Sequence, residues 1–521
     1  MLGRRAYQGD LFDVSPRVAF KIDPHSIFAL IHKLGPLLLR DEDFASMYAE
    51  GQGRPSHPPS LLAGILLLQR HADVSDREAI ERLRFDLRWQ YALRLPVDYN
   101  GFSHANLVHF RSRLIVHGLE GQVFDRFLEL AQKAEIVGPE EAQAIDSSHV
   151  FGAAAVQDTY ELLRQSLRGL LEVLLEEDPS AAEGLIQSYD LEERLAPEKP
   201  DIDWTSKEAR QQWLGALVRD ARALLSALNN RPLAAAPAVQ EAAQLLSQIL
   251  AQDITPPDQE PAITRGVATD RIISTVDPEM RHGRKSSARR FDGYKVHITE
   301  ALKSELITGV AVTAGNSHDG AAAGPLMKDV TERMGSPPET LIGDSHYGSL
   351  DCRVALEEAG VEVIAKLPPA AHGTRPQFGK DRFEIDLENE QVTCPAGETT
   401  EQFSVRKDRK GRPAKMFRFS ADQCQPCVLR EQCTTAKKGR TVRLHYHEET
   451  LQETRAYNQT EEFDQRYSRR ALVSSGSSRS SSGATACATG ATSAVRRPNS
   501  RPSGPPPWST SNAQGRICSK S

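Results

Sequence analysis

Apolar residues recur at helical spacing through much of the first 135 residues of the chain. One apolar run follows Pro58-Pro59, which suits the first turn of a helix, and Ser75 with Glu78 has the spacing of a capping box. A third helix is expected after Ser103. Several short helices with basic edges are typical of a DNA-binding bundle. Generic helical packing explains the same pattern, so both interpretations stay open.

After residue 140 the pattern changes to that of an α/β sheet. Strands are expected over 142–150, 291–298, 306–312, 339–344 and 361–366, and helices over 321–334 and 351–359. A long helical stretch over 158–252 interrupts this run. The order of elements predicts an α/β fold whose sheet has antiparallel and parallel parts.

The composition suits a folded protein of about three domains. The 521 residues are 39% hydrophobic and 26% charged, and seven cysteines are too few for a disulfide scaffold. No apolar run approaches the roughly 18–20 residues of a membrane span. The first residues also lack the apolar core of a signal peptide. The sequence therefore predicts a soluble, cytoplasmic protein with no membrane partner.

The net charge of −6 conceals a strong asymmetry along the chain. The first 464 residues hold 55 basic and 70 acidic residues, a net charge of −15, whereas the last 57 hold nine basic residues and no acid. Twelve acidic residues lie within 161–203, where a solvated helical face is the simplest explanation. Nucleic-acid binding would therefore depend on local basic patches.

Asp146 and Asp344 are the leading candidates for catalysis, because each stands at or near the end of an expected strand. A sheet can direct such side chains into one cleft, where two carboxylates would hold Mg²⁺ (or Mn²⁺), which prefers hard oxygen ligands. A pair of such ions activates a hydroxyl and stabilises the leaving oxygen of a phosphodiester. The simpler alternative is that each aspartate only ends a strand or caps a helix.

A basic segment leads into one of the expected strands. Between residues 281 and 295 there are six Lys or Arg residues and one acid. On a loop beside an acidic cleft they would neutralise DNA phosphates, and a solvated basic loop is the alternative. The expected DNA contacts are these six and two arginines of the third N-terminal helix: Arg281, Arg284, Lys285, Arg289, Arg290, Lys295, Arg111 and Arg113.

Four cysteines have a spacing that suits a structural zinc site. They form the pattern C-x29-C-x2-C-x5-C: Cys394, Cys424, Cys427 and Cys433. Soft thiolates of this kind bind tetrahedral Zn²⁺. The last spacing is looser than usual, and free buried cysteines are the alternative. Near the expected catalytic site lie also His318, His346 and Cys352, for which packing or capping is the simplest role.

Several motifs, in order along the chain, resemble those of DDE-type insertion-sequence transposases. The motifs lie at 144–150 (AIDSSHV), 281–285 (RHGRK), 290–295 (RFDGYK) and 343–348 (GDSHYG). The helix after Pro58-Pro59 and the segment over 102–114 also look like that family's helical N-terminal domain. The resemblance covers about residues 20–470.

This resemblance implies an RNase H-like catalytic core with Asp146 as first catalytic acid and Asp344 as second. It implies Mg²⁺-dependent (or Mn²⁺-dependent) cleavage and transfer of DNA strands at element ends. The partners would be double-stranded DNA, as terminal inverted repeats and target, and further copies of the chain. The expected organisation is a helical DNA-binding domain (1–135), a catalytic core (140–157 and 262–370), a helical insertion (158–261), a Cys-rich zinc-knuckle insertion (371–440), the start of the last core helices (441–472) and a disordered tail (473–521).

The end of the chain departs from the family pattern. The family places its third acid on a late helix as Tyr-x2-Arg-x3-Glu, and here Tyr467 and Arg470 match while Ser474 occupies the glutamate position. After Leu472 come fourteen serines and no acid, a composition typical of disorder. Permitted codons of this tail, read in another frame, give two family-like segments. The tail is therefore interpreted as the product of a frameshift near 471–473.

Three alternatives stay open for the activity. An RNase H-like nuclease without strand transfer would share the fold, and only an assay separates the two. A non-catalytic DNA-binding remnant is favoured by the missing glutamate. A zinc hydrolase using His318 and His346 is the third, and metal analysis after cysteine replacement would test it.

Overall fold

The computed structural model describes residues 1–5, 13–51, 53–229, 231–285, 288–368, 378–407 and 411–469. Contacts divide these residues into two compact units, one formed by 1–69 and 74–120 and the other by 70–73 and the chain from Gly121 onward. Sequence analysis placed this boundary near 135. It lies earlier because the helix α7 (Gln122–Lys133) packs within the second unit, where Gln132 Nε2 donates to the Met334 carbonyl at 2.9 Å.

The first unit is helical, as expected. Its α-helices are α1 (Ser15–Val18), α2 (Ile27–Leu38), α3 (Pro59–Ala72), α4 (Asp76–Phe85), α5 (Leu87–Ala92) and α6 (Ala105–Val116). Ser75 caps α4 by accepting the Glu78 backbone N–H at 3.2 Å. The core includes Phe44, Trp89 and Phe110, each at most 2% exposed. The helices expected near residues 60, 75 and 103 are therefore present.

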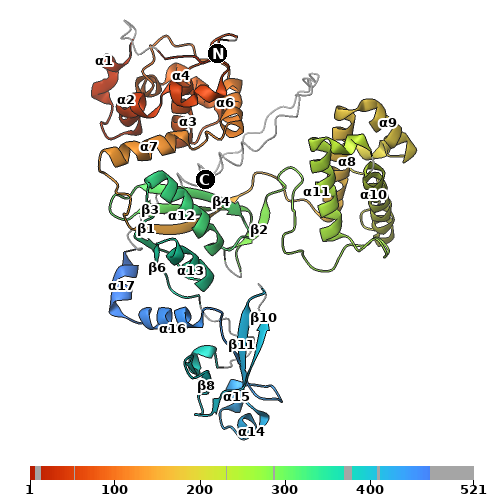
Figure 1. Cartoon of the computed structure of the whole chain (residues 1–521). Coiled ribbons are helices and arrows are strands. Elements are labelled where there is room, and N and C mark those ends of the chain that lie inside the picture. The colour runs from red at the N-terminus through yellow and green to blue at the C-terminus, as the bar shows by residue number, and fades with distance from the viewer. Residues whose placement is uncertain are drawn as a thin grey trace, which may run out of the picture. The chain divides into compact units, whose positions relative to one another are not determined.

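The second unit contains one six-stranded mixed sheet (Figure 1). Its strands are β1 (Gln143–Phe151), β2 (Arg281–Arg284), β3 (Arg290–Ala301), β4 (Ile307–Ala314), β5 (Thr340–Ile342) and β6 (Glu362–Ile364). The order is β2-β3-β1-β5-β6, with β4 paired to β3 as well. β1 is antiparallel to β3 and parallel to β5, which is parallel to β6. The expected combination of antiparallel and parallel parts is present.

Helices pack on both faces of this sheet. On one face, α12 (Gly320–Met334) and α13 (Leu350–Glu358) cover a core that includes Ile145 and Leu341. On the other face, α17 (Glu461–Ser468) places Phe463 against Ile342 and Ile364. Before α17 comes α16 (Glu448–Tyr457). Because side chains alternate along a strand, Asp146 lies on the opposite face from Ile145.

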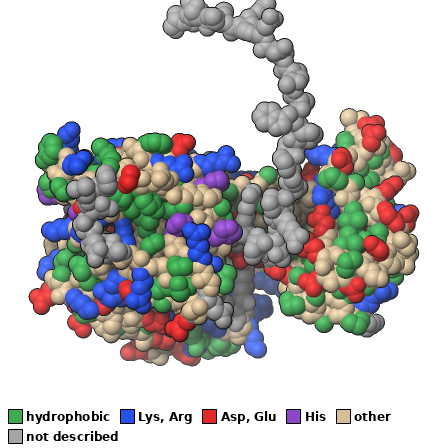
Figure 2. Space-filling model, turned by 90° about the horizontal axis from the view of Figure 1, so that it is seen from above, with side chains coloured by type: hydrophobic (Ala, Val, Ile, Leu, Met, Phe, Trp, Pro, Cys, Tyr) green, Lys and Arg blue, Asp and Glu red, His purple; other side chains and the backbone are tan. Residues whose placement is uncertain are grey.

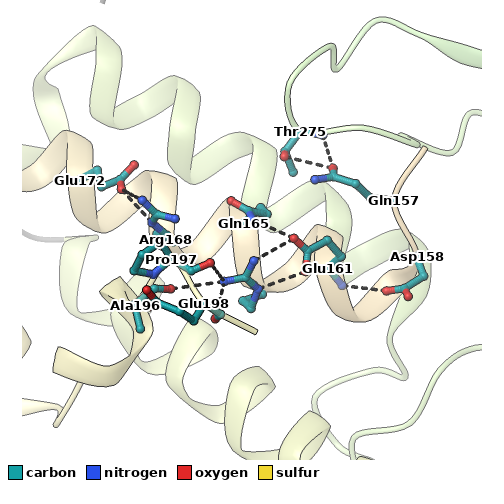
Figure 3. Close-up of polar contacts among 11 residues, drawn as sticks. Gln157, Asp158, Glu161, Gln165, Arg168, Glu172, Ala196, Pro197, Glu198 and Thr275 are labelled. Atoms are coloured by element: carbon teal, nitrogen blue, oxygen red, sulfur yellow. Dashed lines mark hydrogen bonds and ion pairs between the residues drawn. The ribbon is translucent and has the colours of Figure 1, made fainter. Parts of the chain in front are cut away.

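The insertion between β1 and β2 is a helical bundle with its own core. It consists of α8 (Thr159–Glu177), α9 (Pro179–Ser188), α10 (Lys207–Leu228) and α11 (Pro237–Asp253). The buried guanidinium of Arg164 binds Glu161 at 2.8 Å and the carbonyls of residues 196–198 (Figure 3). Acidic side chains are spread over the face of the right-hand lobe in Figure 2. Arg164 thus ties the acidic loop to α8, and the rest of the acidic face is solvated, as expected.

The two ends of the insertion meet. The backbone N–H of Gln157 donates to the Ile273 carbonyl at 2.9 Å, and its side-chain oxygen accepts the Thr275 N–H at 2.7 Å (Figure 3). Nearby, Arg271 forms an ion pair of 2.6 Å with buried Asp253. These contacts form a hydrogen-bonded neck between the bundle and the sheet.

The Cys-rich part forms two small three-stranded sheets. Their strands are β7 (Glu384–Asp386), β8 (Gln391–Thr393), β9 (Thr399–Thr400), β10 (Phe403–Lys407), β11 (Pro413–Arg418) and β12 (Thr441–Arg443). Two short helices follow β11, namely α14 (Ala421–Cys424) and α15 (Arg430–Cys433). In the described parts of the chain, we find no helix whose length and apolar character would let it span a bilayer.

Candidate functional site

Asp146 lies on β1 and Asp344 follows the neighbouring parallel strand β5. The register pairs Gln143 with Leu341 and Ala144 with Ile342, so its continuation brings Asp146 opposite Asp344. Neighbouring strands are about 4.8 Å apart. Both aspartates are partly exposed. Asp146 is the fourth of the nine residues of β1, well before the strand end where it was expected, whereas Asp344 follows the last residue of β5 by two positions.

Two histidines lie at the Asp344 end of this site. The backbone N–H of His346 donates to Asp344 Oδ1 at 2.8 Å, and its Nδ1 lies 3.3 Å from Oδ2. The ring of His318 is 6.3 Å from that of His346. His318 Nδ1 accepts the Gly320 N–H at 3.1 Å. These contacts orient Asp344 and begin α12, which agrees with a packing and capping role for both rings.

A buried ion pair between Lys295 and Asp319 lies on the face of the sheet opposite Asp146. Lys295 Nζ lies 2.6 Å from Asp319 Oδ1 and donates to the Ser317 carbonyl at 2.7 Å. The Ser147 hydroxyl donates to Asp319 Oδ2 at 2.9 Å. Burial raises the pKa of the Asp319 carboxyl, but the hydrogen bond and charge of Lys295 outweigh it and leave the pKa below its ordinary value. Asp319 is therefore ionised near neutral pH, next to the strand that carries Asp146.

A second buried contact joins the sheet to the loop after β5. His297, which is fully buried, lies 2.8 Å from the Tyr347 hydroxyl through Nδ1 and 2.9 Å from Thr313 Oγ1 through Nε2. Burial, together with the charges of Asp319, Asp344 and Asp146, strongly raises the pKa of Tyr347, although a hydrogen bond with Ser147 opposes the shift. Tyr347 is therefore a neutral phenol close to all three carboxylates. Asp319, His297 and Tyr347 were not predicted from the sequence as part of this site. The alternation of β3 and the motif after Asp344 were the available signals.

The carboxylates provide the hard oxygen ligands that Mg²⁺ prefers. In the described residues, however, no group of three or more His, Cys, Asp or Glu side chains is arranged to hold a metal ion. The third acid of the family pattern would fall at position 474, outside the described residues. The donor chemistry of Asp146 and Asp344 thus fits Mg²⁺, and binding of the ion stays a prediction.

The basic segment forms a hairpin rather than the expected loop. β2 pairs with the start of β3 from Arg281 opposite Gly293 to Arg284 opposite Arg290, and the Lys285 N–H donates to the Arg289 carbonyl at 2.9 Å. β2 consists of Arg281-His282-Gly283-Arg284 and shows no alternation of apolar and polar residues, so the sequence pattern did not predict it as a strand. The hairpin fixes the direction of the basic side chains more firmly than a loop would.

The eight residues expected to contact DNA fall into two groups. Three are engaged in ion pairs within the protein: Arg111 with Asp76 at 2.5 Å, Arg281 with Asp270 at 2.7 Å, and Lys295 with Asp319. The other five are exposed: Arg113, Arg284, Lys285, Arg289 and Arg290. Since the charges of the first group are already balanced, the exposed group is better placed to attract phosphates.

The positive charge of the hairpin reaches the strand that carries Asp146. Burial lowers the pKa of His149 on β1, and the charges of Lys285 and Arg289 lower it further. The His149 ring also lies 5.2 Å from that of Phe291 on β3. The exposed basic turn and the aspartates thus belong to one region of the second unit.

The four cysteines of the expected zinc knuckle line one small cavity. The cavity has a volume of about 20 Å³, and Arg440 also lines it. The Arg440 backbone N–H donates to Cys424 Sγ at 3.4 Å. Burial and the three other cysteines raise the pKa of the Cys433 thiol, while Arg440 opposes the shift. The four cysteines thus line one cavity, but among the described residues they do not form a group of three or more side chains arranged to hold a metal ion, and zinc binding stays a prediction.

Comparison with known families decides the family of this chain. A family model described as a transposase domain (DUF772) matches residues 18–113, and one described as a transposase DDE domain matches residues 262–473. The chain belongs to the family of DDE-type insertion-sequence transposases. No curated protein and no solved structure matches it.

The family assignment confirms the resemblance drawn from the sequence motifs. The mixed sheet of the transposase, with helices on both faces, also agrees with the expected RNase H-like α/β core. The DDE match includes Asp344, the basic hairpin and the cysteine cluster, whereas β1 and Asp146 precede it. Because the match does not include Asp146, its assignment as a catalytic residue rests on the pairing of β1 with β5, the strand that precedes Asp344.

Proposed function

We propose that the transposase core cleaves and joins DNA at Asp146 and Asp344, with Mg²⁺ (or Mn²⁺) as its cofactor. The parallel register of β1 and β5 supports this proposal, because its continuation past Ile342 would bring Asp344 level with Asp146. Ions bound there would activate the attacking hydroxyl and stabilise the leaving oxygen. The exposed hairpin residues Arg284, Lys285 and Arg289 would hold phosphates of the DNA.

The site needs a third acid, and the packing of α17 suggests where it belongs. Phe463 of α17 packs on Ile342 and Ile364, the face toward which Asp146 alternates, and the Tyr467 ring is 5.3 Å from that of Phe463. The family pattern puts its third acid seven residues after Tyr467, at position 474, which lies outside the described residues. Because this position is a serine, the chain as it stands would lack one metal ligand.

A second function is therefore a non-catalytic DNA-binding remnant. The neutral, short Ser474 cannot replace a glutamate as a ligand, and this observation favours that candidate. The basic residues precede the proposed frameshift, so salt-dependent DNA binding would survive its loss. The frameshift itself lies outside the described residues.

An end-cleavage assay tests both functions. It compares this chain with a version restored to the shifted frame from residue 471, on DNA that carries the element ends, with Mg²⁺ or Mn²⁺. We expect both proteins to bind the DNA and only the restored version to cut it. Asp344→Asn in the restored version should abolish cutting and retain binding. Equal cutting by both chains would refute the role given to position 474.

We also propose that the four clustered cysteines hold one structural Zn²⁺. The shared cavity and the N–H donated to Cys424 Sγ support this, since thiolate ligands commonly accept such outer hydrogen bonds. The ion would join α14 and α15 to the loop after β8, and so stabilise a part of the chain with a small apolar core.

A further inference from the structure

A pocket of about 750 Å³ lies where the Cys-rich part and α16 meet the carboxyl end of β6. Its lining includes the titratable residues Asp351, Lys366, Lys380, Asp381, His445 and Arg455. We call it the basic pocket. Its volume falls within the range of roughly 300–1,000 Å³ that is usual for ligand sites.

The basic pocket begins beside the candidate catalytic aspartates. β5 and β6 pair Ile342 with Ile364, so the continued register brings Asp344 level with Lys366. The loop after Asp344 stays against Lys366, because a side chain at Gly348 would meet the Lys366 carbonyl at 2.1 Å. Asp344 and Lys366 thus each follow their strand by two residues, and β5 pairs with β1, which carries Asp146.

Several charges in the basic pocket cancel each other. Lys380 Nζ lies 2.5 Å from the buried carboxylate of Glu448, and Arg412 lies 2.6 Å from Asp351. Each pair combines one positive and one negative side chain, so the two pairs add little net charge to the pocket. They also join the segments that surround it.

Two cations are left over. In the described part of the chain, no carboxylate forms an ion pair with Lys366 or Arg455, and the Lys366 ammonium lies over the Tyr467 ring at 5.0 Å. The remaining carboxylate in the lining is that of the exposed Asp381. Burial lowers the pKa of His445, so this side chain adds a neutral ring near pH 7. The basic pocket is thus suited to an anion that carries about one charge.

We propose that the basic pocket binds a backbone phosphate of the DNA strand whose scissile phosphate lies at Asp146 and Asp344. This rests on the proposed function. Two strand spacings, about 10 Å, separate β1 from β6, so a phosphate held by Lys366 and Arg455 is within a few nucleotides of the cleaved bond. Lys366 and Arg455 then fix the register of the strand without reading its sequence.

The salt dependence of DNA binding tests the proposal. Binding of the full chain to a duplex with the terminal inverted repeat is measured by fluorescence anisotropy at several salt concentrations. We expect the Lys366→Gln/Arg455→Gln double variant to lower the slope of log Kd against log salt by about 0.9, the value for one phosphate, and each single variant to lower it by part of this amount. The control Lys328→Gln changes an 80% exposed side chain on α12 and should leave the slope unchanged.

Methylphosphonate substitution then locates the phosphate. Neutral linkages are introduced one at a time along each strand. We expect the neutral linkage to weaken binding of the unmodified protein at one position, or at two adjacent positions, near the cleavage site. The same linkage should not weaken binding of the Lys366→Gln/Arg455→Gln double variant. A free nucleotide as the ligand would instead give equal effects for both proteins at every position, which would overturn the proposal.

Folding is checked with Arg455→Lys, which keeps the charge and should keep the slope. If Arg455→Gln lowers Tm but Arg455→Lys restores both Tm and slope, the contact is confirmed. If both single Gln variants bind like Lys328→Gln while the unmodified chain binds with a normal salt slope, the pocket proposal fails alone. Failure of the unmodified chain to bind DNA would instead contradict the proposed function.

Discussion

The Ser147 hydroxyl donates to Asp319 Oδ2 at 2.9 Å, which ties the residue after Asp146 to the start of α12. Asp319 in turn pairs with Lys295 of β3, and all three side chains lie across the sheet from Asp146. The middle of β1, which carries the first candidate acid, is therefore fixed on its opposite face by a buried charge network. Such support keeps a site in its productive geometry without contact with the substrate.

Asp319→Asn should destabilise the second unit. It removes a charge from a pair whose side chains are only 16% and 11% exposed, leaving Lys295 uncompensated. We expect a loss of about 3 kcal/mol in the free energy of unfolding, as for other buried pairs that lose one partner. The double variant Asp319→Ala/Lys295→Met should recover part of this loss in urea unfolding. An unchanged midpoint in Asp319→Asn would show that the pair contributes little.

His297 should make the stability depend on pH below neutrality. Burial lowers the pKa of His297, with Asp319 opposing and Lys295 assisting the shift. Since the pKa is lower in the folded state, this contribution is complete above the unfolded pKa of about 6.5 and is lost as pH falls through the folded value. Tm should therefore fall between pH 7.5 and 5, and by less in His297→Asn. Parallel Tm curves for both proteins would contradict this assignment.

Zinc should bind to the cysteine cluster in a one-to-one ratio and more tightly at higher pH. Binding requires deprotonated thiols, and the pKa of Cys433 is raised by burial, so each bound ion must displace protons. Elemental analysis should find one zinc per chain, and none in Cys424→Ser/Cys427→Ser. Cys352→Ser changes a buried cysteine outside the cluster and serves as the control. A protein purified without zinc, whose Tm ignores added chelator, would indicate simple buried cysteines.

Phe463→Ala should weaken the attachment of α17 to the sheet. Phe463 is fully buried between Ile342 and Ile364, so we expect a loss of about 3–5 kcal/mol in unfolding free energy. Phe403→Ala is a suitable comparison, because that ring is 38% exposed and should cost less than about 1 kcal/mol. Urea unfolding followed by circular dichroism measures both. Similar losses in the two variants would show that α17 does not contribute to the core.

The sequence predicted the sheet well because its strands and helices have distinct periods. β1, β3 and β4 lie within a few residues of their expected bounds, and both expected helices, now α12 and α13, are present. β2 was missed because its four residues carry no apolar alternation, and only pairing with β3 makes it a strand. Pairing is a long-range property that a local pattern does not contain.

The candidate site was predictable in its two aspartates but not in their support. Asp146 and Asp344 were selected from recognisable motifs, although Asp146 lies within β1 and not at its end, whereas Asp319 follows His318 in a segment with no periodic signal. Arg281 and Lys295 were expected to contact DNA, yet both form ion pairs with aspartates of the same chain. The sequence shows how many charged residues a segment has, but only the fold shows which of them form ion pairs within the protein.

The neck formed by Gln157, Ile273 and Thr275 makes the helical insertion a replaceable module. Because the chain leaves and returns at one hydrogen-bonded point, the length of the bundle imposes no geometric demand on β1 or β3. Lineages could enlarge, shrink or exchange this bundle while the catalytic strands keep their positions. The same point would accept a foreign domain, such as a fluorescent reporter or a programmable DNA-binding protein, as a graft.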